Sequence, residues 1–160
     1  MKKILLILML LISLTGMARE VKVYRGTSRY SSDVVCTVRD GKVYQGRSTY
    51  TSDVLCNVIG GRIYFGTSRY PSDVLFSVRD GLLYKEMSSY RSDVLMRLSG
   101  GRVYGGTSSY PSDVMMTISG GRVYRGRSTY VSDVICNLDG ELSVVEFYAV
   151  VYVLMLYRML

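Results

Sequence analysis

Hydrophobic and polar residues recur every 20 positions between Val21 and Gly140. The recurrence divides this stretch, without an insertion, into blocks 21–40, 41–60, 61–80, 81–100, 101–120 and 121–140. The blocks share the pattern x-x-V-Y-x-G-x-S-x-Y-x-S-D-V-x-x-x-V-x-D/G. Self-similarity at one fixed period is typical of a repeat architecture, in which each period is one structural unit.

Each period predicts two β-strands joined by a tight turn. In the first block, residues 34–38 form a β-branched and apolar run, and residues 42–44 give a second, shorter strand signal. Asp40 and Gly41 lie between them, and a Gly-Gly pair takes their place in other blocks. Both pairs suit a type I′ turn, because its two central residues need positive φ angles. The sequence therefore predicts one β-hairpin per period.

The two-residue turn also fixes which residues face each other. Val38 faces Val43, and Cys36 faces Gln45. The Val38 position repeats as Val, Leu or Ile, and the Cys36 position repeats as Cys, Phe or Met. Because paired residues share one face of a sheet, we expect this face to line the core.

Two strands of the predicted array lack a partner next to them in the sequence. Residues 22–25 have no preceding strand, and residues 134–138 have no following one, because residues 141–146 depart from the pattern. Unpaired strand edges invite aggregation, and pairing the first strand with the last removes both. The expected fold class is mainly β, with six 20-residue β-hairpin repeats in a closed or nearly closed array.

A parallel β-helix with one block per coil is the alternative architecture. It would stack the repeated aspartates, from Asp33 to Asp133, about 4.8 Å apart. Such a ladder of like charges is costly at low dielectric, whereas hairpins separate equivalent residues by about 10 Å. The tight turns also favour hairpins.

A different pattern follows the last block. Ser143 and Glu146 have the spacing of a capping box, and residues 144–160 form an apolar run whose charged residues are Glu146 and Arg158. We expect one α-helix over 144–160. Because it is apolar all round, it should pack on the hairpin array or plug it. The alternative is a membrane span, for which this length is at the lower limit.

The first 18 residues have the organisation of a cleavable signal peptide. Lys2 and Lys3 precede an apolar run from Ile4 to Leu14, and small residues precede Arg19. The expected domain organisation is a signal peptide at 1–18, a six-fold hairpin domain at 19–140 and an apolar helix at 141–160. The formal net charge of the chain is +7.

Basic and aromatic residues share recurring positions in the second strand of each hairpin. If they lie on one outward face, cations alternate with aromatic rings there, and such surfaces bind sugars or anionic polymers. The candidate binding residues are Tyr44, Tyr64, Tyr104, Tyr124, Arg62, Arg102 and Arg122. The alternative is that these basic side chains only keep the outer face of the sheet hydrated. For the repeated Ser-x-Tyr-x-Ser-Asp segment we expect turn chemistry, with the Tyr ring covering apolar surface.

Several kinds of chemistry find no support in the composition. The chain has no His, and no pair of acids, nucleophile–base pair or phosphate-binding loop is evident. Cys36, Cys56 and Cys136 share one repeat position with Phe and Met, so we expect three free cysteines in a core slot. We therefore expect no enzyme activity, no cofactor and no metal site.

The segment from Gly41 to Leu55, which reads G-K-V-Y-Q-G-R-S-T-Y-T-S-D-V-L, resembles the blocks of secreted bacterial tandem-repeat proteins from Bacteroidetes-like genomes. The Asp-Gly-x-x-Tyr hairpins also resemble those of the four-fold β-flower domain, from which six blocks depart. Neither resemblance implies catalysis.

The expected function is that of an exported, non-enzymatic structural or binding protein of the bacterial envelope. Its place would be the periplasm, the cell surface or the extracellular space. The expected partner is a glycan or another envelope polymer, and not nucleic acid. The alternative is a membrane-associated envelope protein anchored by residues 144–160.

Overall fold

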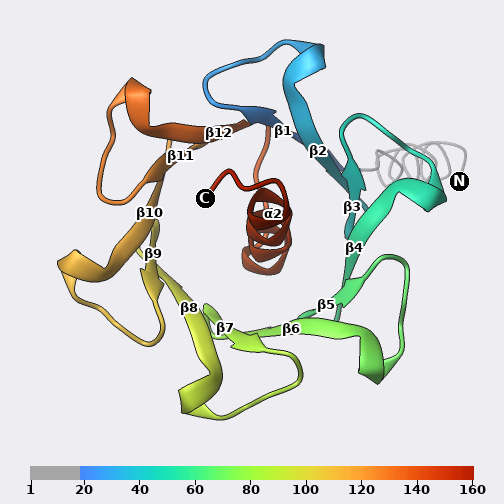
Figure 1. Ribbon diagram of the computed structural model, residues 1–160, viewed down its shortest axis with the longest axis vertical. Helices are drawn as coiled ribbons and strands as arrows, with labels where there is room; N and C mark the ends of the chain where they lie inside the picture. Colours follow the sequence, from blue (N-terminus) through green and yellow to red (C-terminus); the bar gives the residue numbers. More distant parts are fainter. Residues whose placement is uncertain (1–18) are drawn as a thin grey trace, which may run out of the picture.

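The computed structural model of the protein describes residues 19–160, so the predicted signal peptide lies outside the described residues. Strands β1 to β12 form one closed antiparallel barrel, and helix α2 (Val144–Leu156) runs through its centre (Figure 1). The predicted fold class is therefore confirmed. The hairpins form a closed ring, and the C-terminal helix packs inside it.

The strands fall into two sets. Those that lead into a tight turn are β2 (Val34–Arg39), β4 (Val54–Ile59), β6 (Val74–Arg79), β8 (Val94–Ser99), β10 (Val114–Ser119) and β12 (Val134–Leu138). Those that follow such a turn are β3 (Lys42–Gln45), β5 (Arg62–Phe65), β7 (Leu82–Lys85), β9 (Arg102–Gly105) and β11 (Arg122–Arg125), and β1 (Glu20–Arg25) takes the equivalent place at the start.

The hairpin register agrees with the prediction. Between β2 and β3, Val38 pairs with Val43 and Cys36 pairs with Gln45. Asp40 has a φ angle of 51° and the following Gly has one of 71°, as a type I′ turn requires. The two-residue turn thus sets the register of the whole repeat.

The barrel closes where the two ends of the array meet. Arg25 of β1 lies opposite Cys136 of β12, which is the register of a tight hairpin without its connecting turn. The Asp139 side chain accepts a hydrogen bond of 2.6 Å from the backbone N–H of Lys22 and one of 3.4 Å from the hydroxyl of Tyr24. These hydrogen bonds join the ends of β1 and β12 at the place where the other hairpins have a connecting turn.

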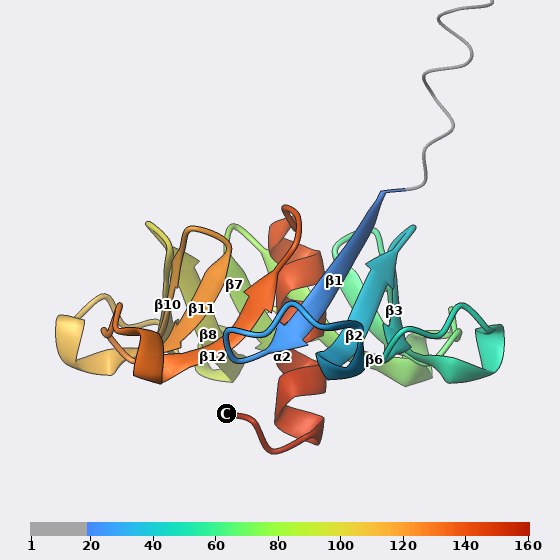
Figure 2. The same cartoon turned by 90° about the horizontal axis from the view of Figure 1, so that it is seen from above.

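At the other end of the barrel, a loop leaves each β-strand that follows a tight turn and returns to the next strand. We call these loops petals; they comprise residues 26–33, 46–53, 66–73, 86–93, 106–113 and 126–133. Each petal ends in a short 3₁₀ turn: η1 (Ser31–Asp33), η2 (Thr51–Asp53), η3 (Pro71–Asp73), η4 (Arg91–Asp93), η5 (Pro111–Asp113) and η6 (Val131–Asp133). The petals spread outward around the barrel (Figures 1 and 2).

The core lies between the inner face of the barrel and α2. The strands that follow a tight turn, together with β1, share one inward position in the core, and its residues are nearly or fully buried: Val23, Val43, Ile63, Leu83, Val103 and Val123. From the helix, Phe147, Tyr148 and Val150 fill the lumen. The hydroxyl of Tyr148 donates a 2.8 Å hydrogen bond to the carbonyl oxygen of Gly81, which satisfies its buried polar group.

The helix begins as predicted but ends earlier. Ser143 and Glu146 form the expected capping box. The helix stops at Leu156 rather than reaching residue 160, because Arg158 adopts a left-handed conformation with a φ angle of 54°. The N–H groups of Arg158 and Met159 then bond back to the carbonyls of Met155 and Leu154, which is a Schellman motif.

Among the described helices, none has both the length and the apolar character needed to cross a membrane.

Candidate functional site

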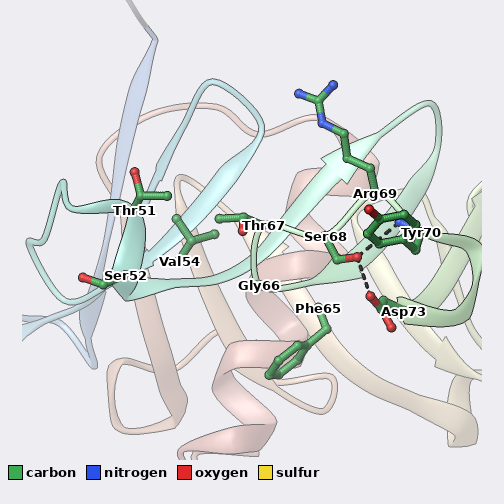
Figure 3. A pocket seen from close by; sticks show the side chains of 10 residues that line it. All are labelled: Thr51, Ser52, Val54, Phe65, Gly66, Thr67, Ser68, Arg69, Tyr70 and Asp73. Atoms are coloured by element: carbon green, nitrogen blue, oxygen red, sulfur yellow. Dashed lines mark hydrogen bonds between the residues drawn. The ribbon is translucent and has the colours of Figure 1, made fainter.

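Every petal is braced by the same side-chain hydrogen bonds. The Ser68 hydroxyl donates to the Asp73 carboxylate at 2.5 Å, and the same Ser oxygen accepts from the backbone N–H of Tyr70 at 3.2 Å (Figure 3). The N–H of Asp73 donates to the carbonyl oxygen of Tyr70. The same three bonds recur in the other five petals. This is the expected turn chemistry, and it leaves each petal with a defined shape.

A second set of hydrogen bonds holds the petals to the outer face of the barrel. The donors share one outward position on the strands that lead into the tight turns: Thr37, Asn57, Ser77, Arg97, Thr117 and Asn137. Their acceptors are backbone carbonyls of a neighbouring petal. Asn57, for example, donates to the carbonyls of both Gly66 and Ser68 at 2.9 Å. Across the seam, Asn137 donates to the carbonyl of Ser28, so the last block holds the first petal.

These contacts explain where the predicted binding tyrosines lie. Tyr44, Tyr64 and Tyr124 are buried, although they lie on the outer face of the sheet, and Tyr104 is half-buried. The expectation that these rings form an exposed aromatic surface therefore needs correction. Beside these rings, the paired outward residues Thr37, Asn57 and Thr117 hold the petals against the same face. In the first hairpin, the guanidinium of Arg39 lies 5.5 Å from the ring centre of Tyr44.

The predicted basic residues are more accessible than the tyrosines. Arg62 and Arg102 are exposed, and Arg122 is half-buried. All three lie at the start of a strand, next to the tight turns, and each is one period or more away from the next. The structure thus spreads these cations around the turn end of the barrel and does not gather them with the tyrosine rings into one site.

The exposed aromatic residues are a different set of tyrosines. The side chains of Tyr30, Tyr50, Tyr70, Tyr90, Tyr110 and Tyr130 are 71–77% exposed, one at the same place in each petal. We call this set the petal-tip tyrosines. The expectation that these rings cover apolar surface is wrong. A signal was present in the sequence, because the residues around each of these tyrosines are mostly polar and offer little apolar surface to cover.

A groove lies between neighbouring petals. The one between the second and third petals has a volume of about 740 Å³ and is lined by Thr51, Ser52, Phe65, Arg69, Tyr70 and nearby residues (Figure 3). A similar groove, of about 670 Å³, lies at the first petal beside Arg25, Arg29 and Tyr30. Figure 3 shows Arg69 and Phe65 pointing in opposite directions from this region. The residues that line each of these two grooves include an exposed Tyr, side-chain hydroxyl groups and an Arg.

The fold and its petals define a class of protein: a closed, six-fold antiparallel hairpin barrel that repeats one loop around its perimeter. The family model that matches the chain has this symmetry. It describes the 6-fold beta flower protein and matches residues 23–151. The chain belongs to this family, and the resemblance to β-flower hairpins is confirmed, with six-fold rather than four-fold repetition. No curated protein and no solved structure matches the chain significantly.

Proposed function

We propose that this β-flower protein is an exported, non-enzymatic binding protein of the bacterial envelope, and that its petal-tip tyrosines contact a glycan polymer. The observation that carries the proposal is the exposure of one ring per petal at 71–77%. A ring so accessible at the same place in every petal adds nothing to the core, and Tyr is enriched at interfaces, where its ring meets apolar surface and its hydroxyl stays wet. Tyr is well suited to such contacts, because it offers a large amphipathic surface at little cost in conformational entropy.

Repetition supports a polymeric partner. A chain of similar sugar units can touch several equivalent tips at once, and each further contact is then made within the same complex. Weak single contacts can in this way produce useful overall binding. The bracing of each tip by its Ser and Asp residues supports the same conclusion, because a preformed loop loses less entropy on binding.

Retention on immobilised envelope polysaccharide tests the proposal. Residues 19–160 would be compared with variants in which two, four or all six petal-tip tyrosines are changed to Ser. We expect retention to fall more steeply than in proportion to the number of tips removed, and by more than about tenfold when all are changed. The matched control is Met87→Ser with Val131→Ser, which removes two exposed apolar side chains from the petals but no tip ring. Equal retention of the six-fold variant and the control would overturn the proposal.

Export makes a separate prediction about the N-terminus. The basic start, the apolar run and the small residues before Arg19 support cleavage by a signal peptidase. Mass spectrometry of envelope fractions should find a mature chain that begins near Arg19. Recovery of the intact chain, with Met1, from the cytoplasm would contradict export.

A further inference from the structure

We call the petal end of the barrel, from which the last part of α2 emerges, the mouth, and the strand register defines the residues of its rim. Arg25 lies opposite Cys136, and Arg125 lies opposite Met116. Directly paired residues project from the same face of a sheet. Since Cys136 and Met116 are buried in the lumen, Arg25 and Arg125 project from the inner face at the edge of the mouth, where they are exposed. The rim positions are Arg25, Gln45, Phe65, Lys85, Gly105 and Arg125.

A second ring of apolar residues lies just inside this rim. Each strand that leaves a petal has a bulge at its second residue, and in the first and last blocks this residue, Val35 or Ile135, is buried in the core. The equivalent residues Leu95 and Met115 are instead 41% and 45% exposed. On this side of the mouth, apolar side chains face solvent although their equivalents in other blocks are covered.

The end of the central helix completes this surface. Figure 2 shows the last part of α2 and the C-terminal residues projecting beyond the petals. Leu156 is 51% exposed, and Met155 and Leu160 are also exposed. These residues form an apolar protrusion at the mouth, and Phe65 of the rim is itself 62% exposed. We call the rim, the inner ring and this protrusion the mouth face.

Cations surround the apolar part of the mouth face. Arg25, Lys85 and Arg125 lie on the rim, and Arg158 follows the end of the helix. Acidic side chains of the described residues also lie at this end of the barrel: Glu86, whose carboxylate lies 3.9 Å from the ammonium of Lys85, and the petal aspartates, such as Asp33 in the groove beside Arg25. Arg25 and Arg125 have no salt-bridge partner within the part of the chain that the structure describes.

We propose that the mouth face rests on an anionic lipid surface, with the apolar protrusion entering the headgroup region and the rim cations facing lipid phosphates. An exposed apolar patch in a soluble fold marks an interaction site. Apolar side chains ringed by Lys and Arg are the composition of an interfacial membrane contact, in which apolar burial and electrostatic attraction act together. This contact differs from a membrane span, because most of α2, from Phe147 to Leu154, is buried in the barrel.

The same charges argue against a second copy of the chain as the occupant. In a face-to-face dimer about a two-fold axis, each rim would meet the identical rim of its partner. Arg25, Arg125 and Arg158 would then lie among like charges in a surface from which water is partly excluded, which is unfavourable. A lipid surface that carries phosphates provides the opposite charge.

The proposal goes beyond the binding of a glycan and does not depend on the petal-tip tyrosines, so the two can fail separately. In this orientation the petals radiate along the membrane plane, with their tips at the perimeter (Figures 1 and 2). Binding to vesicles should therefore survive the loss of the petal-tip tyrosines, and retention on polysaccharide should survive changes in the mouth face.

The absence of Trp from the chain allows a direct test. Phe65→Trp places a single Trp, which can be excited selectively over the tyrosines, on the rim, and Ile59→Trp places one at an exposed position next to a tight turn, at the far end of the barrel. Residues 19–160, which form the closed barrel, would be mixed with vesicles of phosphatidylglycerol and phosphatidylethanolamine, or of phosphatidylcholine alone. We expect a blue shift for Phe65→Trp on the anionic vesicles and no shift for Ile59→Trp.

Vesicle co-sedimentation separates the contributions of charge and apolar contact. Arg25→Gln with Arg125→Gln should weaken partitioning more than about tenfold, because each surface cation contributes about a five-fold factor. The matched control, Arg102→Gln with Arg122→Gln, removes the same charge at the turn end and should change partitioning little. Leu95→Asp with Leu156→Asp should abolish binding, and circular dichroism would show that these exposed changes leave the fold intact.

Three results would overturn the proposal. The first is no binding of the unchanged protein to anionic vesicles. The second is binding that the two arginine pairs weaken equally, which would indicate non-specific attraction to the whole charged protein. The third is a dimer in solution that Leu95→Asp and Leu156→Asp disrupt, together with no effect of these variants on vesicle binding. That result would assign the mouth face to self-association.

Discussion

At the scale of single residues, small polar side chains decide the shape of the petals. Ser108 and Ser112 both donate hydrogen bonds to the carboxylate of Asp113. These bonds favour the charged form of the acid and hold its pKa below the usual value of 3.8, the Ser108 bond having the larger effect. In each of the other petals, the Ser equivalent to Ser108 donates the same hydrogen bond to the Asp equivalent to Asp113.

This arrangement predicts how stability depends on pH. Because the pKa of Asp113 is lowered in the folded state, its contribution is fully present above the unfolded value of 3.8 and is lost as the pH falls through the lower, folded value. Urea midpoints measured from about pH 5 to about pH 2 should therefore fall, and Ser108→Ala with Ser112→Ala should reduce this fall. Ser109→Ala, in the same petal, is the control. A fall that the double variant leaves unchanged would contradict the assignment.

The three cysteines give a second prediction at this scale. Cys36, Cys56 and Cys136 are free and buried, as the shared core position predicted. Burial raises the pKa of both Cys56 and Cys136 to about 12, so little reactive thiolate forms at neutral pH. Denatured, unreduced protein should yield three thiols, and the native protein should alkylate slowly. An introduced cysteine at the exposed Ile59 should react quickly. A mapped bridge between Cys36 and Cys56 would contradict the hairpin arrangement.

At the scale of elements, the hairpins could be predicted in detail and the helix in part. A two-residue turn leaves one register, so the pairing of Val38 with Val43 followed from the sequence. The start of α2 followed from its capping box. Its end did not, because the usual signal of a Schellman motif is Gly, and here Arg158 takes the left-handed position.

The candidate site was less predictable, because it depends on contacts between distant residues. Whether Tyr64 is covered depends on how the petals lie on the outer face, and that position is set by hydrogen bonds such as those from Asn57. Alternation along the strand showed that Tyr64 faces outward but not that it is buried. The exposure of Tyr70 differs, because the polar residues around it gave a local signal and the hydrogen bonds that brace its petal are also local.

The central helix makes a prediction about the core. Val150 is fully buried in the lumen, so Val150→Asp would place an unpaired charge among apolar side chains, at a cost of several kcal/mol. We expect this variant to lose cooperative unfolding and solubility. Met155→Asp lies on the same helix at an exposed position and should unfold like the unchanged protein.

A chain that ends at residue 140 lacks the central helix and should not fold. A folded, soluble truncation would contradict the packing of α2 as a requirement of the fold.

At the scale of the whole molecule, closure turns a linear repeat into a ring. The seam carries the same contacts as the interior of the array: β1 pairs with β12, and Asn137 of the last block holds the first petal. Among the strands of residues 19–160, closure leaves no edge unpaired. It also places the six petal tips around one perimeter and all the rim positions around one mouth, and both proposed interactions depend on that arrangement.

Amide hydrogen exchange across the seam tests closure most directly. The N–H groups of β1 and β12 that face each other lie in a ladder as regular as that between β6 and β7, so they should be protected to a similar degree. The seam and the interior hairpin would be compared in one native sample. The closed ring predicts slow exchange in both. Fast exchange of the β1 and β12 amides, beside slow exchange between β6 and β7, would show an open array and contradict the account.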